Sequence, residues 1–155
     1  MAGLSCKHTQ MMAKVTLKSV PDKPGIAAEV FAALAERGVL AELLATIPTG
    51  RHKGDIAFAV PQQELPAVQD ALAAVKKAVG FKSIDSDDGV SVISVHGGAL
   101  SADPATASRV LKALAGAGVN LQMINQSLNQ LSFMVNRAQL RQALAVLKDS
   151  CGAEE

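Results

Sequence analysis

The sequence predicts an α+β fold made of two small βαββαβ modules, and an internal repeat is the main reason. The pattern of residues 31–39 returns eighty positions later in residues 111–119. A slightly shorter offset aligns residues 55–60 with residues 130–135. The repeated unit is too long for a solenoid repeat, so two copies of one compact module fill the chain.

The first copy begins with a strand, a helix and a second strand. Residues 13–20 nearly alternate apolar and polar side chains, which is typical of a half-buried strand. Pro24 suits the first turn of a helix, and an apolar stripe predicts that helix over residues 26–37. Gly38 is a good helix terminator, and the mostly apolar residues 39–47 form the second predicted strand.

The first copy ends with a strand, a helix and a short strand. Residues 55–60 read as the third strand, and Pro61 opens a second helix with apolar residues at helical spacing. Residues 81–84 form a short fourth strand, and the acidic residues 85–89 form a turn. This order is the ferredoxin-like split βαβ, in which two helices cover one face of an antiparallel sheet.

The second copy follows the same order but lacks its last strand. Residues 151–155 cannot supply one, whereas residues 4–8 are a spare strand-like segment before the first copy. Because an open sheet edge invites aggregation, we expect residues 4–8 to complete the second sheet. The predicted domains are residues 10–87, and residues 1–9 together with 88–155. The predicted strand, helix, strand, strand and helix of the second copy are residues 91–97, 104–117, 119–126, 130–136 and 137–150.

Composition excludes several classes of function. The net charge of +1 and the 3% of aromatic residues argue against a nucleic-acid or anionic-membrane surface. Charged residues interrupt the most apolar stretch, residues 26–47, so it is not a membrane span. Residues 1–12 lack the apolar run of a signal peptide, and we expect a cytoplasmic protein. Cys6 and Cys151 are therefore expected to be free thiols.

No pattern in the sequence indicates catalysis, a metal or a cofactor. The three histidines stand singly, without the spacing of metal ligands. The acidic residues 85–88 lack the ordered spacing of a calcium loop, and no nucleophile is paired with a base. We therefore predict no catalytic residue, no metal site and no cofactor.

The residues that open the first copy indicate a family. Residues 13–28 contain Val20-Pro21-Asp22-Lys23-Pro24-Gly25 and resemble the start of the first ACT domain in the regulatory region of aspartate kinases. Residues 118–124, Gly-Val-Asn-Leu-Gln-Met-Ile, resemble the corresponding part of the second ACT domain. The resemblance covers essentially the whole chain. It includes the N-terminal strand, because in aspartate kinases the first ACT domain is inserted into the second.

The resemblance implies a tandem ACT regulatory module rather than an enzyme. It implies an amino-acid effector, lysine or threonine or a related end product, that exerts allosteric feedback control. It also implies a homodimer through ACT–ACT contacts, and a separate kinase chain as partner if this chain is a small regulatory subunit. No nucleic acid and no membrane are expected as partners.

The candidate effector site combines two segments. At the helix start, the N–H groups of Gly25 and Ile26 lack internal partners and suit a carboxylate, while Asp22 suits an ammonium group. The alternative is a plain loop with Asp22 as a local helix cap. Asn120 is the second candidate, and its alternative is a turn asparagine that satisfies nearby backbone. The candidate residues are Asp22, Lys23, Pro24, Gly25, Ile26, Ala27, Asn120, Leu121 and Ile124.

The chain also departs from the family pattern. Leu40 stands where the family usually carries an asparagine, Thr46 where a glutamine is common, and residues 103–105 where Pro-Gly is usual. With these departures, at most one of each pair of equivalent positions in the two copies keeps an intact effector site. The departures also favour an alternative, a stand-alone ACT protein that acts by protein–protein contact or binds another small ligand. A further alternative is an acylphosphatase-like hydrolase, which wants an arginine where this loop has only Lys23.

Overall fold

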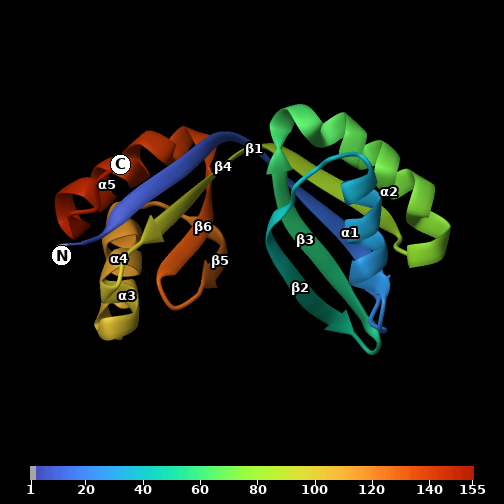
Figure 1. The fold of residues 1–155 in the computed structure, drawn as a ribbon, viewed down its shortest axis with the longest axis horizontal. Helices are drawn as coiled ribbons and strands as arrows, with labels where there is room; N and C mark the ends of the chain where they lie inside the picture. The colour runs from blue at the N-terminus through green and yellow to red at the C-terminus, as the bar shows by residue number, and fades with distance from the viewer. Residues whose placement is uncertain (1–2) are drawn as a thin grey trace. The chain divides into compact units, whose positions relative to one another are not determined.

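Two long strands organise the chain, which a computed structural model describes over residues 3–155 (Figure 1). These strands are β1 (Ser5–Pro21) and β4 (Ser83–His96), which are neighbours in a six-stranded sheet. The chain divides into two compact units, and both strands contribute to each of them. We call Met11–Asp88 the central unit, and Met1–Gln10 with Gly89–Glu155 the split unit.

The central unit has the order βαββαβ. Its helices α1 and α2 pack against each other and against the strands, and one apolar core joins all of these elements. Val30 and Leu34 of the first helix, Leu72 of the second and Phe58 of the sheet are buried in that core. Between the two long strands, the elements are α1 (Ile26–Glu36), β2 (Glu42–Gly50), β3 (Lys53–Pro61), the 3-10 turn η1 (Gln62–Glu64) and α2 (Leu65–Val79).

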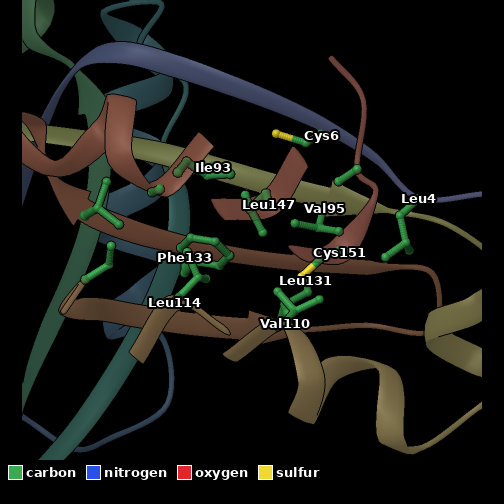
Figure 2. Packing of buried hydrophobic residues seen from close by; sticks show 14 of the residues in the cluster. Leu4, Cys6, Ile93, Val95, Val110, Leu114, Leu131, Phe133, Leu147 and Cys151 are labelled. Atoms are coloured by element: carbon green, nitrogen blue, oxygen red, sulfur yellow. The ribbon is translucent and has the colours of Figure 1, made fainter. Parts of the chain in front are cut away.

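The split unit repeats this order. Figure 2 shows its core, in which Phe133 of the sheet lies among Leu114, Leu147 and Ile93. The strands β4 and β6 pair in an unbroken register from Val90↔Asn136 to His96↔Gln130. After β4 the elements are α3 (Ala99–Ala102), α4 (Ala105–Gly116), β5 (Leu121–Gln126), β6 (Gln130–Asn136), the 3-10 turn η2 (Arg137–Gln139) and α5 (Leu140–Cys151).

The N-terminal segment completes the split unit, as predicted. Leu4 and Cys6 are buried in the core of that unit, and the Ser91 hydroxyl on β4 donates to the Gln10 carbonyl at 2.6 Å. The chain end contributes more than expected, because Ser5 and Glu154 form a parallel bridge. The predicted α+β class with two βαββαβ modules is confirmed.

Two predicted interruptions of strands are wrong. Residues 5–8 of the first predicted strand and residues 13–20 of the second belong to one strand, β1, and the predicted turn at residues 85–89 lies inside β4. Residues 85–88 are exposed and polar, so they lack the apolar alternation that marks a half-buried strand. Backbone pairing extends the strand where side-chain pattern gives no signal.

Both cysteines are free thiols, as predicted, and the structure shows that both are buried. Across residues 3–155, no helix has the length and apolar character needed to cross a bilayer. In the same residues, no three His, Cys, Asp or Glu side chains gather in a way that would hold a metal ion.

Candidate functional site

The start of α1 is the centre of the candidate site. Strand β1 ends at Pro21, and the Asp22 N–H donates to the His52 carbonyl at 2.8 Å. Gly25 caps the helix with a φ of 93°, a left-handed conformation that glycine adopts without strain. The first N–H groups of a helix have no partners within it, so those of Ile26 and Ala27 are available to a ligand.

The Asp22 carboxylate does not cap this helix. It is exposed, and among the described residues it has no hydrogen-bond or ion-pair partner. Asp22 is therefore not the local helix cap that the alternative supposed. Its free carboxylate and the helix N–H groups form an acceptor and a set of donors on one loop. Such a combination suits a zwitterion.

A pocket of about 140 Å³ lies against this loop. Its volume is close to that of the engineered cavity of about 150 Å³ that binds benzene, so it has room for a small molecule. Four of the predicted residues line it, and the end of β1 and the hairpin of β2 and β3 form the rest of the wall. The lining residues of the loop are Asp22, Lys23, Ile26 and Ala27, and those of the hairpin include Thr46, Ile47, Lys53 and Asp55.

Asp55 is a site residue that sequence reasoning missed. Its side chain is buried and accepts from the Lys18 ammonium at 2.7 Å and from the Ser19 N–H at 3.0 Å. These bonds hold the pKa of the Asp55 carboxyl below its ordinary value, with the Lys18 bond the larger cause. The pKa of Lys18 is raised by the same bond. This carboxylate is already committed to two partners, unlike that of Asp22.

Pro24 and Gly25 belong to the same loop but do not line this pocket, and Asn120, Leu121 and Ile124 belong to the split unit and do not line it either. The Asn120 N–H donates to Gln139 Oε1 at 3.1 Å, and Gln139 Nε2 donates to the Gly118 carbonyl at 2.9 Å. The Gln139 side chain therefore satisfies the backbone of this turn. The alternative had assigned that role to the Asn120 side chain. Leu121 begins β5 and is half-buried, whereas Ile124 is 52% exposed.

The two edge strands share a backbone irregularity. Leu43 in β2 and Met123 in β5 are the equivalent residues of the repeat, and both are left-handed, with φ of 54° and 50°. Each lies where its strand has one residue more than its partner, a β-bulge. Strained backbone at non-glycine residues tends to mark functional segments, and here it recurs at equivalent positions next to Asn120 and its counterpart Leu40.

Comparison with known proteins supplies the family. Residues 93–150 match the family model of the ACT domain. This part of the chain is similar to the ACT domain. Aspartokinase from Mycolicibacterium smegmatis is 32% identical over 149 residues, which is 94% of this chain but 35% of that protein. Aspartokinase from Thermus thermophilus is 31% identical over 125 residues, and this chain spans 31% of it. The chain therefore spans about a third of the length of these curated relatives.

Solved structures are similar to nearly the whole length of the chain. The ligand-free regulatory subunit of aspartate kinase from Thermus thermophilus superposes with a TM-score of 0.87 at 27% identity, covering 97% of this chain and 99% of that one. Aspartate kinase from Synechocystis superposes with a TM-score of 0.88 at 27% identity, covering 96% of this chain and 27% of that one.

The predicted resemblance to the regulatory region of aspartate kinases is thus confirmed. The first of these structures is a regulatory subunit, which agrees with the prediction that this chain has no catalytic activity of its own.

Proposed function

We propose that this chain is an amino-acid-binding regulatory module of an aspartate kinase. The observation that carries the proposal is the pocket at the start of α1, where an unpartnered Asp22 carboxylate lies beside unpaired helix N–H groups. The alignment with an aspartate kinase regulatory subunit along 97% of the chain supports the regulatory role. The module acts by binding an end product and changing the activity of a kinase.

The chemistry of the pocket matches the two charged ends of a free amino acid. The ligand carboxylate accepts from the N–H groups of Ile26 and Ala27, where the helix dipole is positive. The ligand ammonium donates to Asp22. Lysine or threonine is the expected effector, and the pocket volume of about 140 Å³ suits a molecule of that class.

The remaining candidate residues act from a second copy of the chain in this proposal. The central unit and the split unit would be two ACT domains, residues 10–87 and residues 1–9 with 88–155. Asn120, Leu121 and Ile124 would face the loop of a partner protomer in a homodimer, with a kinase chain as a further partner. The 52% exposure of Ile124 and the 75% exposure of Leu40 support such contacts, because large apolar side chains on a surface favour association.

Calorimetric titration with lysine and with threonine tests the proposal. Asp22→Ala and Asn120→Ala should each weaken binding by about 1–3 kcal/mol, the cost of losing a charge-assisted hydrogen bond. Asp70→Ala is the matched control, since Asp70 is an exposed carboxylate on α2 that does not line the pocket. If Asp70→Ala weakens binding as much as Asp22→Ala does, the assigned site is wrong.

One observation favours a second candidate, a stand-alone ACT protein that acts by protein–protein contact. Leu40 replaces the family's usual asparagine and is 75% exposed, as an apolar contact residue would be. This candidate predicts that neither amino acid binds, and that light scattering at tens of micromolar still reports a dimer or larger assembly. A monomer that binds no amino acid would contradict both candidates.

A further inference from the structure

The strand that leads into the candidate loop contains a β-bulge. In the pairing of β1 with β3, Leu17 lies opposite Ile56 and Val20 lies opposite Gly54. Two residues of β1, Lys18 and Ser19, are therefore opposite the single residue Asp55 of β3. Ser19 has a φ of 55°, a left-handed conformation that costs a non-glycine residue free energy. Something in the fold must hold this strained geometry.

The Asp55 side chain contacts both residues of the bulge. One carboxylate oxygen accepts from the Lys18 ammonium at 2.7 Å, and the other accepts from the Ser19 N–H at 3.0 Å. The Lys18 carbonyl in turn accepts from the Lys82 N–H at 2.8 Å. Asp55 is 6% exposed, whereas the Lys18 side chain is 42% exposed, so the ammonium of this pair remains open to water. We call Asp55 with Lys18 the bulge clamp.

The bulge sets the direction in which the following residues face. Side chains alternate along a strand, so a slip of one residue moves each of them to the opposite face. With the bulge in place, Val20 is 2% exposed in the core, and β1 ends at Pro21. Asp22 then meets the His52 carbonyl and borders the pocket. Without the bulge, Val20 would point to solvent and Asp22 would leave the rim.

The split unit offers an internal comparison. Its equivalent strands β4 and β6 pair without a shift, and the counterpart of Asp55 is Gln130, opposite His96. Gln130 Nε2 donates to the Ser132 hydroxyl on its own strand rather than to the neighbouring strand. The equivalent strand pair therefore forms without a bulge clamp, and the clamp belongs to the strand that leads to the pocket.

We propose that Asp55, held by Lys18, is a positioning residue that fixes the loop of residues 22–27 in its ligand-binding conformation. The part of this inference that concerns ligand affinity rests on the proposed function. The part that concerns the loop itself does not, because it can be measured in the ligand-free protein.

Hydrogen exchange of backbone amides tests the loop directly. Asp55→Ala should speed exchange of the Ser19 and Asp22 amides by about tenfold or more, while the amides in the middle of α2 stay unchanged, because local opening does not require global unfolding. Asp55→Asn keeps an acceptor for the Ser19 N–H and should have a smaller effect. Lys18→Met should also have a smaller effect, since it leaves that bond intact.

A second-site variant separates positioning from general stability. Glycine reaches the left-handed φ of residue 19 without strain, so Ser19→Gly in the Asp55→Ala background should slow loop exchange again. Arg109→Met is the control, because it removes an exposed ion pair of 2.6 Å to Asp103 in the split unit. This control should change neither loop exchange nor affinity.

Titration of the same variants with threonine and with lysine links the loop to binding. Asp55→Ala should lower affinity by about tenfold, and Ser19→Gly should recover part of the loss. Faster exchange spread evenly over the central unit, or no rescue by glycine, would overturn the positioning role. Local exchange changes in a protein that binds neither amino acid would uphold the clamp and contradict the proposed function.

Discussion

Replacing Gly25 by alanine separates backbone conformation from steric fit at the candidate site. Gly25 has a φ of 93°, and a Cβ built there meets no atom within 4 Å. The substitution therefore adds no clash, and its cost is the left-handed conformation alone, about 1–2 kcal/mol for an L-residue. For a chain of 155 residues, this loss corresponds to a fall in Tm of about 2–8 °C.

Denaturant unfolding with a matched glycine measures this cost. Gly116, at the end of α4, is not left-handed and also has open space around a built Cβ. Gly116→Ala should stabilise the chain by about 0.4–1 kcal/mol, because alanine loses less backbone entropy on folding. The free energy of unfolding of Gly25→Asn should lie between those of the parent and Gly25→Ala, since asparagine tolerates the left-handed region better than alanine does.

The Gly25→Ala variant also tests whether the loop binds the amino acid. If residue 25 leaves its left-handed conformation, the N–H groups of Ile26 and Ala27 turn away from the pocket, and amino-acid affinity falls together with stability. Equal stability of Gly25→Ala and the parent would refute the assignment of the strained conformation. A loss of stability with unchanged affinity would refute the role of these N–H groups in binding.

Three further outcomes are expected. Deleting residues 1–9 removes Cys6 and its strand from the split-unit core, so light scattering should show aggregation, and a monodisperse folded product would contradict the assignment. The pKa of Asp55 is lowered in the folded protein, mainly by its hydrogen bond with Lys18. The carboxylate therefore stabilises the fold at pH values above its ordinary pKa of 3.8, and this stabilisation is lost as the pH falls through the folded-state pKa. Asp55→Asn should remove this part of the acid unfolding profile. Burial raises the thiol pKa of Cys6 and Cys151, so a thiol reagent should label the native protein slowly. Fast labelling would mean that at least one of the two thiols is accessible.

The repeat made the fold predictable. Once two copies of a strand–helix–strand pattern are aligned, the missing strand of the second copy and the spare segment at residues 4–8 account for each other. The helix and strand positions follow from apolar periodicity, which responds to burial on one face. Periodicity fails where burial is absent, and this is why the exposed residues 85–88 of β4 read as a turn.

The candidate site was only partly predictable. The loop at Asp22 follows from a local string of residues, and the pocket beside it was found where the loop meets the hairpin. The contact of Lys18 with Asp55 spans 37 positions and depends on the register of two strands, which no local pattern specifies. Likewise, the turn before Asn120 is satisfied by Gln139 from a 3-10 turn nineteen residues later.

The insertion of one unit within another has a consequence for synthesis on the ribosome. The central unit, residues 11–88, is continuous, so all of it is synthesised before residues 89–155 of the split unit. The split unit needs Leu4 from the beginning and Glu154 from the end, which meet through a hydrogen bond of 3.3 Å. Its N-terminal strand must therefore wait, already made but unpaired on one side, while about 150 residues follow it. The central unit can therefore complete its contacts first, and the strand that precedes it reaches its native partners only after residue 154 has been made.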